Sequence, residues 1–444
     1  MAGESLLVTP EALTIEEPSA QVGKGRILTA SVIGSVIEWY DYALYGTAAA
    51  LIFGHLFFPK ADPMVATVAT FGTFAAGFIA RPFGGLIAGY YGDKIGRKST
   101  LVLTLMTMSL ATTLIGCLPT YAQAGALAPI LLLLLRILQG MAVGGEWGGA
   151  VLMAVEFAPA GRRGYWGSFP QVGPSAGILL GTASFSLVSF FVSEADFLTW
   201  GWRIPFLISL LLAAVGMYIR LRVSETPSFK RIHQLTRETK NPLMSVVREH
   251  PRELFHAIFA RFADGGNFYL LTVFLLAYAA DQAHIPRSQS LICLMIGTFA
   301  NVITIPFFGR LSDSLGRRAV FIGGAIFMAV WAWPMFAMVD SGKASMLAFG
   351  LSIMMIFGHA PVYSTLASYY AELFPARMRY SGISIGYQSA GIILGGFMPL
   401  IASALILTTD GKPWPVILII AAQSLIAALS LYLGPETYKR DISM

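Results

Sequence analysis

Long apolar stretches alternate with short polar segments along the whole chain. Six of these stretches contain no Asp, Glu, Lys or Arg, and they cover residues 99–118, 164–193, 288–309, 319–339, 344–371 and 381–409. Each is as long as the roughly 20 residues that a helix needs to cross the hydrocarbon core of a bilayer. Transmembrane β-strands need only about 9–11 residues and alternate polar with apolar positions, unlike these stretches. The pattern therefore predicts membrane-spanning α-helices.

The same pattern, followed through the less apolar regions, predicts twelve spans. We place them at residues 27–53, 67–91, 99–118, 126–156, 164–192, 201–221, 254–280, 289–309, 318–339, 344–371, 380–408 and 414–434. Prolines mark turns between them at Pro59, Pro63, Pro119 and Pro286. The predicted fold class is an all-α membrane protein with twelve transmembrane helices.

Composition narrows the class of protein further. Of 444 residues, 56% are hydrophobic and 12% are charged, whereas soluble domains carry about 25% charged residues. The net charge of +6 does not indicate nucleic-acid binding, because most charges lie between the apolar stretches. No phosphate-binding Gly-x4-Gly-Lys-(Ser/Thr) loop, His-Glu-x2-His zinc motif or strand–nucleophile–helix elbow is indicated. We expect no enzymatic activity, no cofactor and no metal, with Cys117 and Cys293 as packing residues.

Lys and Arg are distributed unevenly over the loops. With the N-terminus inside, the cytoplasmic segments hold 22 of the 30 basic residues and the outside loops hold 4. Cytoplasmic loops of membrane proteins carry such an excess. Both termini are therefore expected in the cytoplasm, with residues 1–25 as a disordered acidic tail instead of a cleaved signal peptide.

Two polar motifs recur in the same order, at offsets of 220 and 216 residues. The first pairs Gly89, Asp93, Gly96, Arg97 and Lys98 with Gly309, Asp313, Gly316, Arg317 and Arg318. The second pairs Glu156 and Arg163 with Glu372 and Arg379. Such repeats indicate two six-helix halves, at residues 26–222 and 253–434. A cytoplasmic linker at 223–252 joins them, and a cytoplasmic C-tail follows at 435–444.

The first repeated loop, Gly-x3-Asp-x2-Gly-Arg-(Lys/Arg), resembles the pattern of the major facilitator superfamily. The stretches at residues 38–42, 80–84, 136–140, 144–149 and 201–206 are similar to its metabolite:proton symporters, which include shikimate, α-ketoglutarate, citrate and proline/betaine permeases. The resemblance covers the chain after residue 25. It implies the major facilitator fold, with the substrate path between the two halves.

The repeated loops are expected to form a gate that closes the cytoplasmic side and so stabilises the outward-facing state. Gly89 and Gly309 allow neighbouring helices to approach closely, and Asp93 and Asp313 can hold a helix end across the interface of the halves. The alternative is that these charges only set the topology. The expected gate residues are the ten of the first motif together with Glu156, Arg163, Glu372 and Arg379.

Two carboxylates in span one are the candidates for proton coupling. Glu38 and Asp41 are three residues apart and share one helix face, with Trp39, Tyr40, Tyr42 and Tyr45 around them. Burial favours the neutral form of a carboxyl group. Such a group can take a proton from outside and release it inside. The alternative is a fixed salt bridge, for instance to Arg136.

Two charges in span four are ten residues apart, on the order of 15 Å along a helix, so they lie at different depths. Arg136 carries a permanent charge and a planar fork suited to a carboxylate. It can bind an anionic substrate or serve as counter-ion to Asp41. Glu146 is flanked by glycines that allow close helix packing, so it is either functional or structural.

Span seven also carries a buried pair of charges. Arg261 and Asp264 are three residues apart and either serve the transport path or form an internal salt bridge. Many members of the resembled branch carry Arg-x2-Glu here, so Asp264 is one carbon shorter. Gln139, Tyr45 and Asn267 are further candidates for the substrate and charge network. His359 is the only histidine well inside a span, and we expect it to be structural.

These features predict a proton-coupled symporter that imports a small polar metabolite by alternating access, with an organic acid as the expected substrate. The partners would be the substrate, the proton and the lipid bilayer, but no nucleic acid, and the protein would be a monomer. The resemblance implies the bacterial inner membrane. The alternatives are an exporter of the same fold and a membrane sensor that does not transport.

Overall fold

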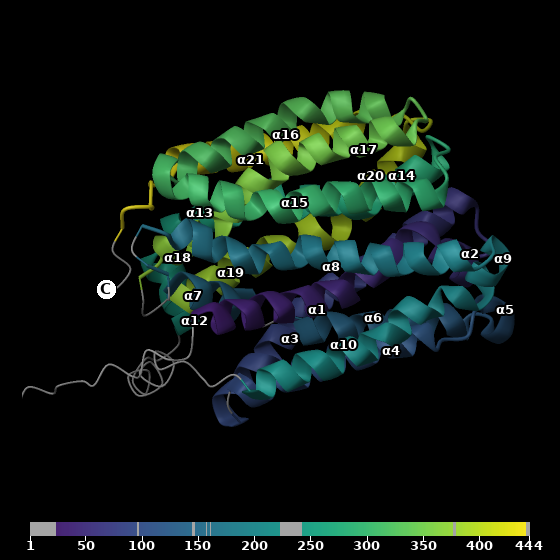
Figure 1. The fold of residues 1–444 in the computed structure, drawn as a ribbon, viewed down its shortest axis with the longest axis horizontal. Helices are drawn as coiled ribbons and strands as arrows, with labels where there is room; N and C mark the ends of the chain where they lie inside the picture. Colours follow the sequence, from purple (N-terminus) through teal and green to yellow (C-terminus); the bar gives the residue numbers. More distant parts are fainter. Residues whose placement is uncertain are drawn as a thin grey trace, which may run out of the picture.

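The computed structural model describes residues 24–95, 97–143, 147–156, 158–159, 161–222, 242–375 and 379–440. Two predicted site residues, Gly96 and Glu146, lie outside these ranges, as do the N-terminal tail and most of the linker. Within the described ranges the chain is almost entirely helical (Figure 1).

The first half supplies six spans. They are α1 (Lys24–Leu51), α3 (Pro63–Ile95), α4 (Arg97–Gly116), α6 (Leu127–Val143) with α7 (Trp147–Glu156), α8 (Arg163–Phe191) and α10 (Arg203–Arg222). Short helices follow some of them at one end of the bundle: α2 (Phe53–Phe57), α5 (Tyr121–Ala124), α9 (Glu194–Asp196) and the π-helical turn η1 (Phe197–Gly201).

The second half supplies the other six spans, preceded by α12 (Pro242–Glu249). Three spans are continuous helices: α15 (Arg287–Leu315), α16 (Arg317–Val339) and α21 (Trp414–Leu433). In each of the other three spans a π-helical turn joins two α-helices. The first consists of α13 (Pro251–Tyr269), η3 (Leu270–Phe274) and α14 (Leu275–Asp281), and the second of α17 (Ala344–Ile353), η4 (Met354–His359) and α18 (Ala360–Leu373). The third consists of α19 (Arg379–Gly391), η5 (Ile392–Phe397) and α20 (Met398–Thr408). Such turns are often found at functional sites.

The two halves lie against each other with their helices roughly aligned (Figure 1). Helices α3, α4, α6 and α10 form the lower part of the view and α16, α17 and α21 the upper part, while α8 and α15 run side by side between them. Helix α1 packs along the other side of α8. The predicted fold of twelve spans in two halves is confirmed.

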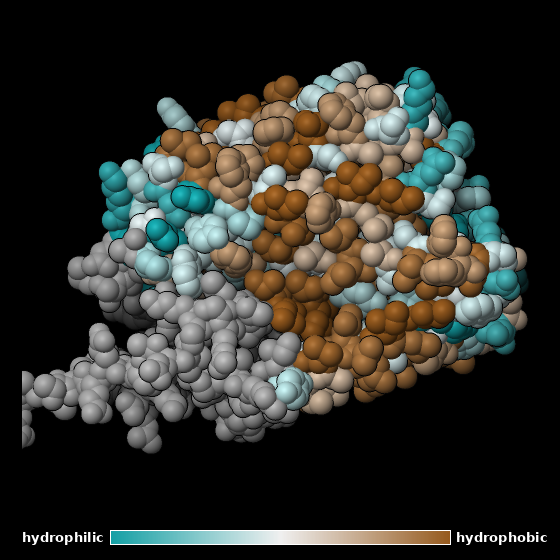
Figure 2. All heavy atoms as spheres, viewed as in Figure 1, coloured by the Kyte–Doolittle hydropathy of each residue, from teal (hydrophilic) through white to brown (hydrophobic). Residues whose placement is uncertain are grey.

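The outer surface is that of a membrane protein. Figure 2 shows apolar side chains across the middle of one face and hydrophilic ones at both ends. Large apolar side chains are widely exposed, for example Phe190 at 83% and Val330 at 69%, where lipid would cover them. Among the described residues, seven helices are long and apolar enough to cross a membrane, and the bent pair Glu194–Gly201 with Arg203–Tyr218 makes an eighth.

Candidate functional site

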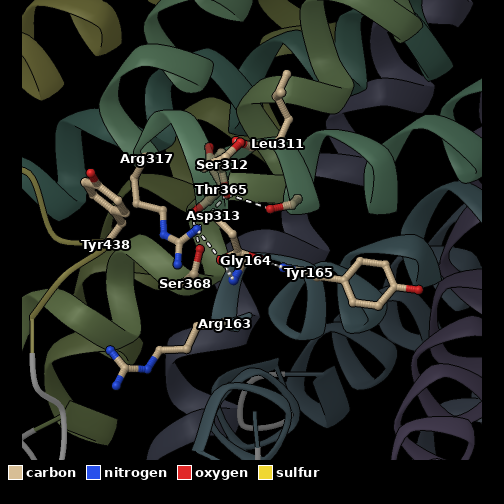
Figure 3. A network of polar contacts seen from close by, with 12 residues as sticks. Arg163, Gly164, Tyr165, Leu311, Ser312, Asp313, Arg317, Thr365, Ser368 and Tyr438 are labelled. Carbon is tan, nitrogen blue, oxygen red and sulfur yellow. Dashed lines mark hydrogen bonds and ion pairs between the residues drawn. The ribbon is translucent and has the colours of Figure 1, made fainter. Parts of the chain in front are cut away.

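A polar link between the halves lies at the start of α8. The Asp313 carboxylate, at the end of α15, accepts hydrogen bonds from the backbone N–H groups of Gly164 (2.7 Å) and Tyr165 (2.9 Å). Figure 3 shows Asp313 between these two residues and Arg317. The first N–H groups of a helix have no partner within it and carry its partial positive charge. Asp313 therefore caps a helix of the opposite half.

Arg317, the first residue of α16, holds Asp313 in place. Its Nη1 donates to Asp313 (2.9 Å) and to Ser312 (2.7 Å), while Nε and Nη2 donate to the two carboxylate oxygens of Glu372 (3.1 and 3.0 Å). Thr437 donates a further hydrogen bond to Glu372 (2.8 Å). Bidentate Arg–carboxylate contacts fix the relative orientation of the two groups in addition to pairing their charges. Acids and bases from the second copies of both repeated motifs thus form one network.

Two further ion pairs join the halves near this network. Arg379 Nη1 lies 3.1 Å from a carboxylate oxygen of Glu156, and Arg163 Nη1 lies 3.9 Å from Glu372. All four residues belong to the second repeated motif. Together with the hydrogen bonds of Asp313, these ion pairs connect α7, α8, α15, α18 and the start of α19 at one end of the bundle.

Glycines allow α8 and α15 to pack closely at the end of the bundle where these ion pairs lie. A Cβ atom on Gly309 would lie 2.6 Å from the Cβ of Ser168 in α8, and one on Gly164 would lie 2.4 Å from the carbonyl oxygen of Gly309. A Cβ atom cannot come this close to a carbon or oxygen atom to which it is not bonded. Helices α15 and α8 therefore approach at a distance that only glycine permits.

The turn after α15 also depends on glycine. Gly316 has φ of +94°, a region that other residues rarely adopt. The carboxylate of Glu436 accepts hydrogen bonds from the N–H groups of Arg317 (3.0 Å) and Arg318 (3.1 Å), and so caps α16. The Arg318 side chain donates to the carbonyl oxygen of Tyr432.

The first copy of the loop is placed by its backbone. Gly89 and Asp93 lie near the end of α3, and Arg97 and Lys98 begin α4. This copy therefore joins two helices of the first half as Gly316 joins α15 and α16 in the second.

Asp41 is buried inside the first half. Its side chain is fully covered, and its two oxygens accept hydrogen bonds from Ser109 (2.7 Å) in α4 and from Ser209 in α10. Within the described ranges, no Lys, Arg or His lies at ion-pair distance from this carboxylate. Glu38, one turn earlier in α1, is 7% exposed. The predicted alternative of a direct Asp41–Arg136 salt bridge is therefore not formed in this conformation.

Gln139 lies between Asp41 and Arg136. Its Nε2 donates to Thr112 (2.8 Å) and to the Asp41 carbonyl oxygen (3.3 Å), while its Oε1 accepts from Arg136 Nη1 (2.5 Å). These contacts join α1, α4 and α6. The sequence places Gln139 and Arg136 one helical turn apart, but only the packing brings them to Asp41.

Aromatic rings enclose the Arg136 guanidinium. It lies 4.3 Å from the ring centres of Tyr42 and Tyr45 and 4.7 Å from that of Phe74, and such faces attract cations. A Cβ on Gly77 of α3 would lie 2.7 Å from Arg136 Nε, so glycine makes the space for it. The Tyr45 hydroxyl is hydrogen bonded to Thr73 (2.6 Å).

A second buried network lies in the second half. Arg261 Nη1 pairs with one oxygen of Asp264, and His359 Nε2 lies 3.1 Å from the other. His359 Nδ1 lies 2.8 Å from Asn301 Nδ2, which in turn donates to Ser175 of α8 (2.8 Å). The network therefore reaches from α13 through η4 and α15 into the first half.

His359, which we expected to be structural, belongs to this buried network. Its pairing with Asp264 depends on a helix 95 residues away, and no local pattern indicates that. Asn267, a predicted member of the network, instead donates to Ser424 of α21 (2.8 Å). It braces two helices of the second half.

Comparisons with known proteins agree with this architecture. Residues 27–254 match the family described as "Sugar (and other) transporter", and residues 257–443 match "Major Facilitator Superfamily". The chain is 39% identical to the shikimate transporter of Escherichia coli (strain K12), over 93% of this chain and 95% of that protein. It is 32% identical to the proline/betaine transporter of the same strain, over 94% of this chain and 84% of that protein.

Solved structures show the same fold. The proton:xylose symporter XylE bound to 6-bromo-6-deoxy-D-glucose superposes with a TM-score of 0.75 at 19% identity, covering 94% of this chain and 97% of that one. The relatives are transporters and not enzymes, as the sequence predicted. The chain belongs to the major facilitator superfamily, in the branch of metabolite transporters that includes the shikimate and proline/betaine transporters.

Proposed function

We propose that this protein is a proton-coupled symporter that imports a small organic acid. It would work in the bacterial inner membrane as a monomer with both termini in the cytoplasm. The relatives support the metabolite class, since the names of two of them specify shikimate, which is a carboxylate, and the zwitterions proline and betaine. The proposed halves, at residues 26–222 and 253–434, would rock around a site near the middle of the membrane.

The surroundings of Asp41 support proton coupling at this residue. An ionisable group near the bilayer centre costs about 2.5–3.5 kcal/mol on insertion scales, so it usually serves a function or has a charged partner. Asp41 is fully buried, with two hydroxyl groups and no described cation on its carboxylate. Hydroxyl groups both donate and accept hydrogen bonds, so they can solvate the carboxylate and the protonated acid alike.

The proton and the anion would be linked through span four. Arg136 contacts Gln139, and Gln139 contacts the backbone of Asp41. Protonation of Asp41 would remove one negative charge from the surroundings of Arg136. The guanidinium would then attract an anion more strongly, which is the coupling that symport requires.

The gate supports alternating access. Asp313, Arg379 and Arg163 link the halves at the end of the bundle where the repeated loops lie. By the predicted topology this end is cytoplasmic, so the conformation has its cytoplasmic side closed. Import would require these links to break after the substrate and the proton have entered.

The experiment is uptake of radiolabelled compounds into proteoliposomes, with and without an inward proton gradient. The panel would hold shikimate, α-ketoglutarate, citrate, short monocarboxylates, aromatic acids and betaine. We expect one acid to accumulate only with the gradient, and Asp41→Asn to abolish accumulation while retaining exchange. Asp410→Asn is the matched control, because Asp410 is exposed and its φ of +51° suits Asn. Gradient-independent uptake by the wild type would refute proton coupling.

A further inference from the structure

An aromatic contact joins the two halves deeper in the bundle than the gate. Trp147, at the start of α7, stacks on Tyr387 of α19, with ring centres 3.6 Å apart and ring planes 16° apart. Tyr387 is buried and Trp147 is half-buried. Stacked aromatic rings attract each other beyond the effect of the apolar area that they bury. Since each half supplies one ring, this contact stabilises only conformations in which α7 and α19 lie close together.

A buried amide adds a polar link between the halves beside this stack. The Gln171 side chain of α8 accepts a hydrogen bond from the indole Nε1 of Trp147 (3.0 Å) through its Oε1. Its Nε2 donates to the backbone carbonyl oxygen of Tyr363 in α18 (3.0 Å). Gln171 is fully covered, and a buried amide is unfavourable when its partners are lost. Gln171 therefore orients the indole and holds α8 against the second half.

The residues of these two contacts lie at one depth. They form what we call the inner layer, which consists of Trp147, Gln171, Tyr363 and Tyr387. Each lies eight or nine residues from the gate residue of the second repeated motif in its own helix, on the side away from the end of the bundle. At 1.5 Å per residue, this spacing is about 12–14 Å. The inner layer is therefore separate from the gate.

The inner layer also follows the internal repeat of the chain. Trp147 and Tyr363 are 216 residues apart, which is the offset of the second repeated motif. Gln171 and Tyr387 are separated by the same offset. The two halves therefore contribute equivalent positions to the inner layer, as they do to the gate. Two pairs of equivalent positions that meet across the halves indicate a second closure of the same path.

Arg261 connects the inner layer to the buried charges of the second half. Its guanidinium lies 3.8 Å from the ring centre of Tyr387, and the faces of aromatic rings attract cations. Trp147 already covers one face of this ring, so the guanidinium lies over the other. Arg261 also pairs with Asp264. The Tyr387 ring thus lies between the charged network of α13 and the first half.

We propose that the inner layer is a second cytoplasmic barrier, which closes the path between the halves independently of the gate. Tyr387 is its positioning residue, because Arg261 on one face of the ring fixes the other face against Trp147. The barrier opens when the Trp147–Tyr387 stack and the Gln171–Tyr363 hydrogen bond separate. The inference rests on the alternating access of the proposed function, but not on proton coupling or on the identity of the substrate.

The test measures how often the cytoplasmic side is open, in the purified full-length chain in detergent and without any ligand. Spin labels on α8 and α15 near the gate report the ratio of separated to closed molecules. We expect Trp147→Ala and Tyr387→Leu each to raise this ratio about 2- to 12-fold, the equivalent of about 0.5–1.5 kcal/mol. Trp147→Phe, which keeps a ring, should raise it less. Trp333→Ala is the matched control, because Trp333 is exposed on the outer surface of α16.

Double variants distinguish two barriers from one. Trp147→Ala combined with Tyr387→Leu should raise the ratio no more than the larger single change, because both remove the same contact. Trp147→Ala combined with Asp313→Asn should multiply the two single effects, because separate sites act additively in free energy. If Trp147→Ala does not fold, Tyr387→Leu takes its place, with Tyr387→Phe as the variant that keeps the ring.

Two results would overturn the proposal. One is an unchanged ratio in Trp147→Ala and Tyr387→Leu. The other is a combined effect with Asp313→Asn that is no larger than that of Asp313→Asn alone, which would make the inner layer part of the gate. Neither result depends on the uptake assay, so proton-coupled symport stands or fails separately.

Discussion

The imidazole of His359 and the carboxylate of Asp264 are 3.1 Å apart, between Nε2 and Oδ1, and both side chains are buried. The other carboxylate oxygen faces Arg261. Asp264 therefore lies between a permanently charged guanidinium and an imidazole, a group that becomes a cation when it is protonated. The His359 ring stacks on Phe268, with ring centres 4.8 Å apart. Its Nδ1 contacts Asn301, which continues the chain of hydrogen bonds to the first half.

We predict that His359→Ala lowers the rate of uptake. The change removes one buried partner from Asp264, which keeps Arg261, and one from Asn301, which keeps Ser175; each buried polar atom left unsatisfied costs about 1–3 kcal/mol. Uptake rates and thermal unfolding in detergent would be measured together. His284→Gln is the control, since His284 is exposed in a loop. A His359→Ala variant with normal rate and stability would show that the network has no importance for transport.

Removing one charge of the Arg261–Asp264 pair should destabilise the protein more than removing both. A buried ion that loses its partner costs about 3–5 kcal/mol, whereas replacing the whole pair is often close to neutral. The measurement is the unfolding temperature of Asp264→Asn, Arg261→Gln and the double variant. The double variant should unfold at a higher temperature than either single one. Additive losses would show that the two charges do not depend on each other.

Asp313→Asn should weaken closure of the gate. The neutral amide interacts less favourably with the helix N-terminus of α8, and caps and helix-end charges contribute about 0.5–2 kcal/mol. Spin labels on α8 and α15 near the gate would report the distance between the halves. We expect a larger population of the separated state than in wild type. Asp196→Asn, at an exposed position, should leave the distribution unchanged.

Closure should also fail when the close contact of α8 and α15 is blocked. In Gly309→Ala the added Cβ would lie 2.6 Å from Ser168, so the helices must separate. We expect uptake to fall and the gate to open in the same spin-label experiment. Gly323→Ala is the matched control, because nothing lies within 4 Å of a Cβ at that helical position. Full activity of Gly309→Ala would contradict the close contact as a requirement for transport.

The spans, their order and the two-half arrangement were predictable from the sequence, because each depends on local properties. Hydrocarbon selects apolar segments of sufficient length, and the duplicated loops fix how the segments are grouped. The repeated acids and bases could likewise be identified as one set. Their partners could be given only in outline, since Asp313 contacts backbone N–H groups almost 150 residues away.

Only the tertiary structure decided what surrounds the buried charges. Asp41 meets Ser109 and Ser209, 68 and 168 residues away, and not Arg136, which was the alternative partner. No sequence pattern gives such pairings, because they depend on which face each helix turns toward its neighbours and on how closely glycines let the helices pack. The sequence by itself therefore determined that this protein crosses the membrane twelve times as two related halves. The packing of those helices decided which buried groups meet, because each partner comes from a different span.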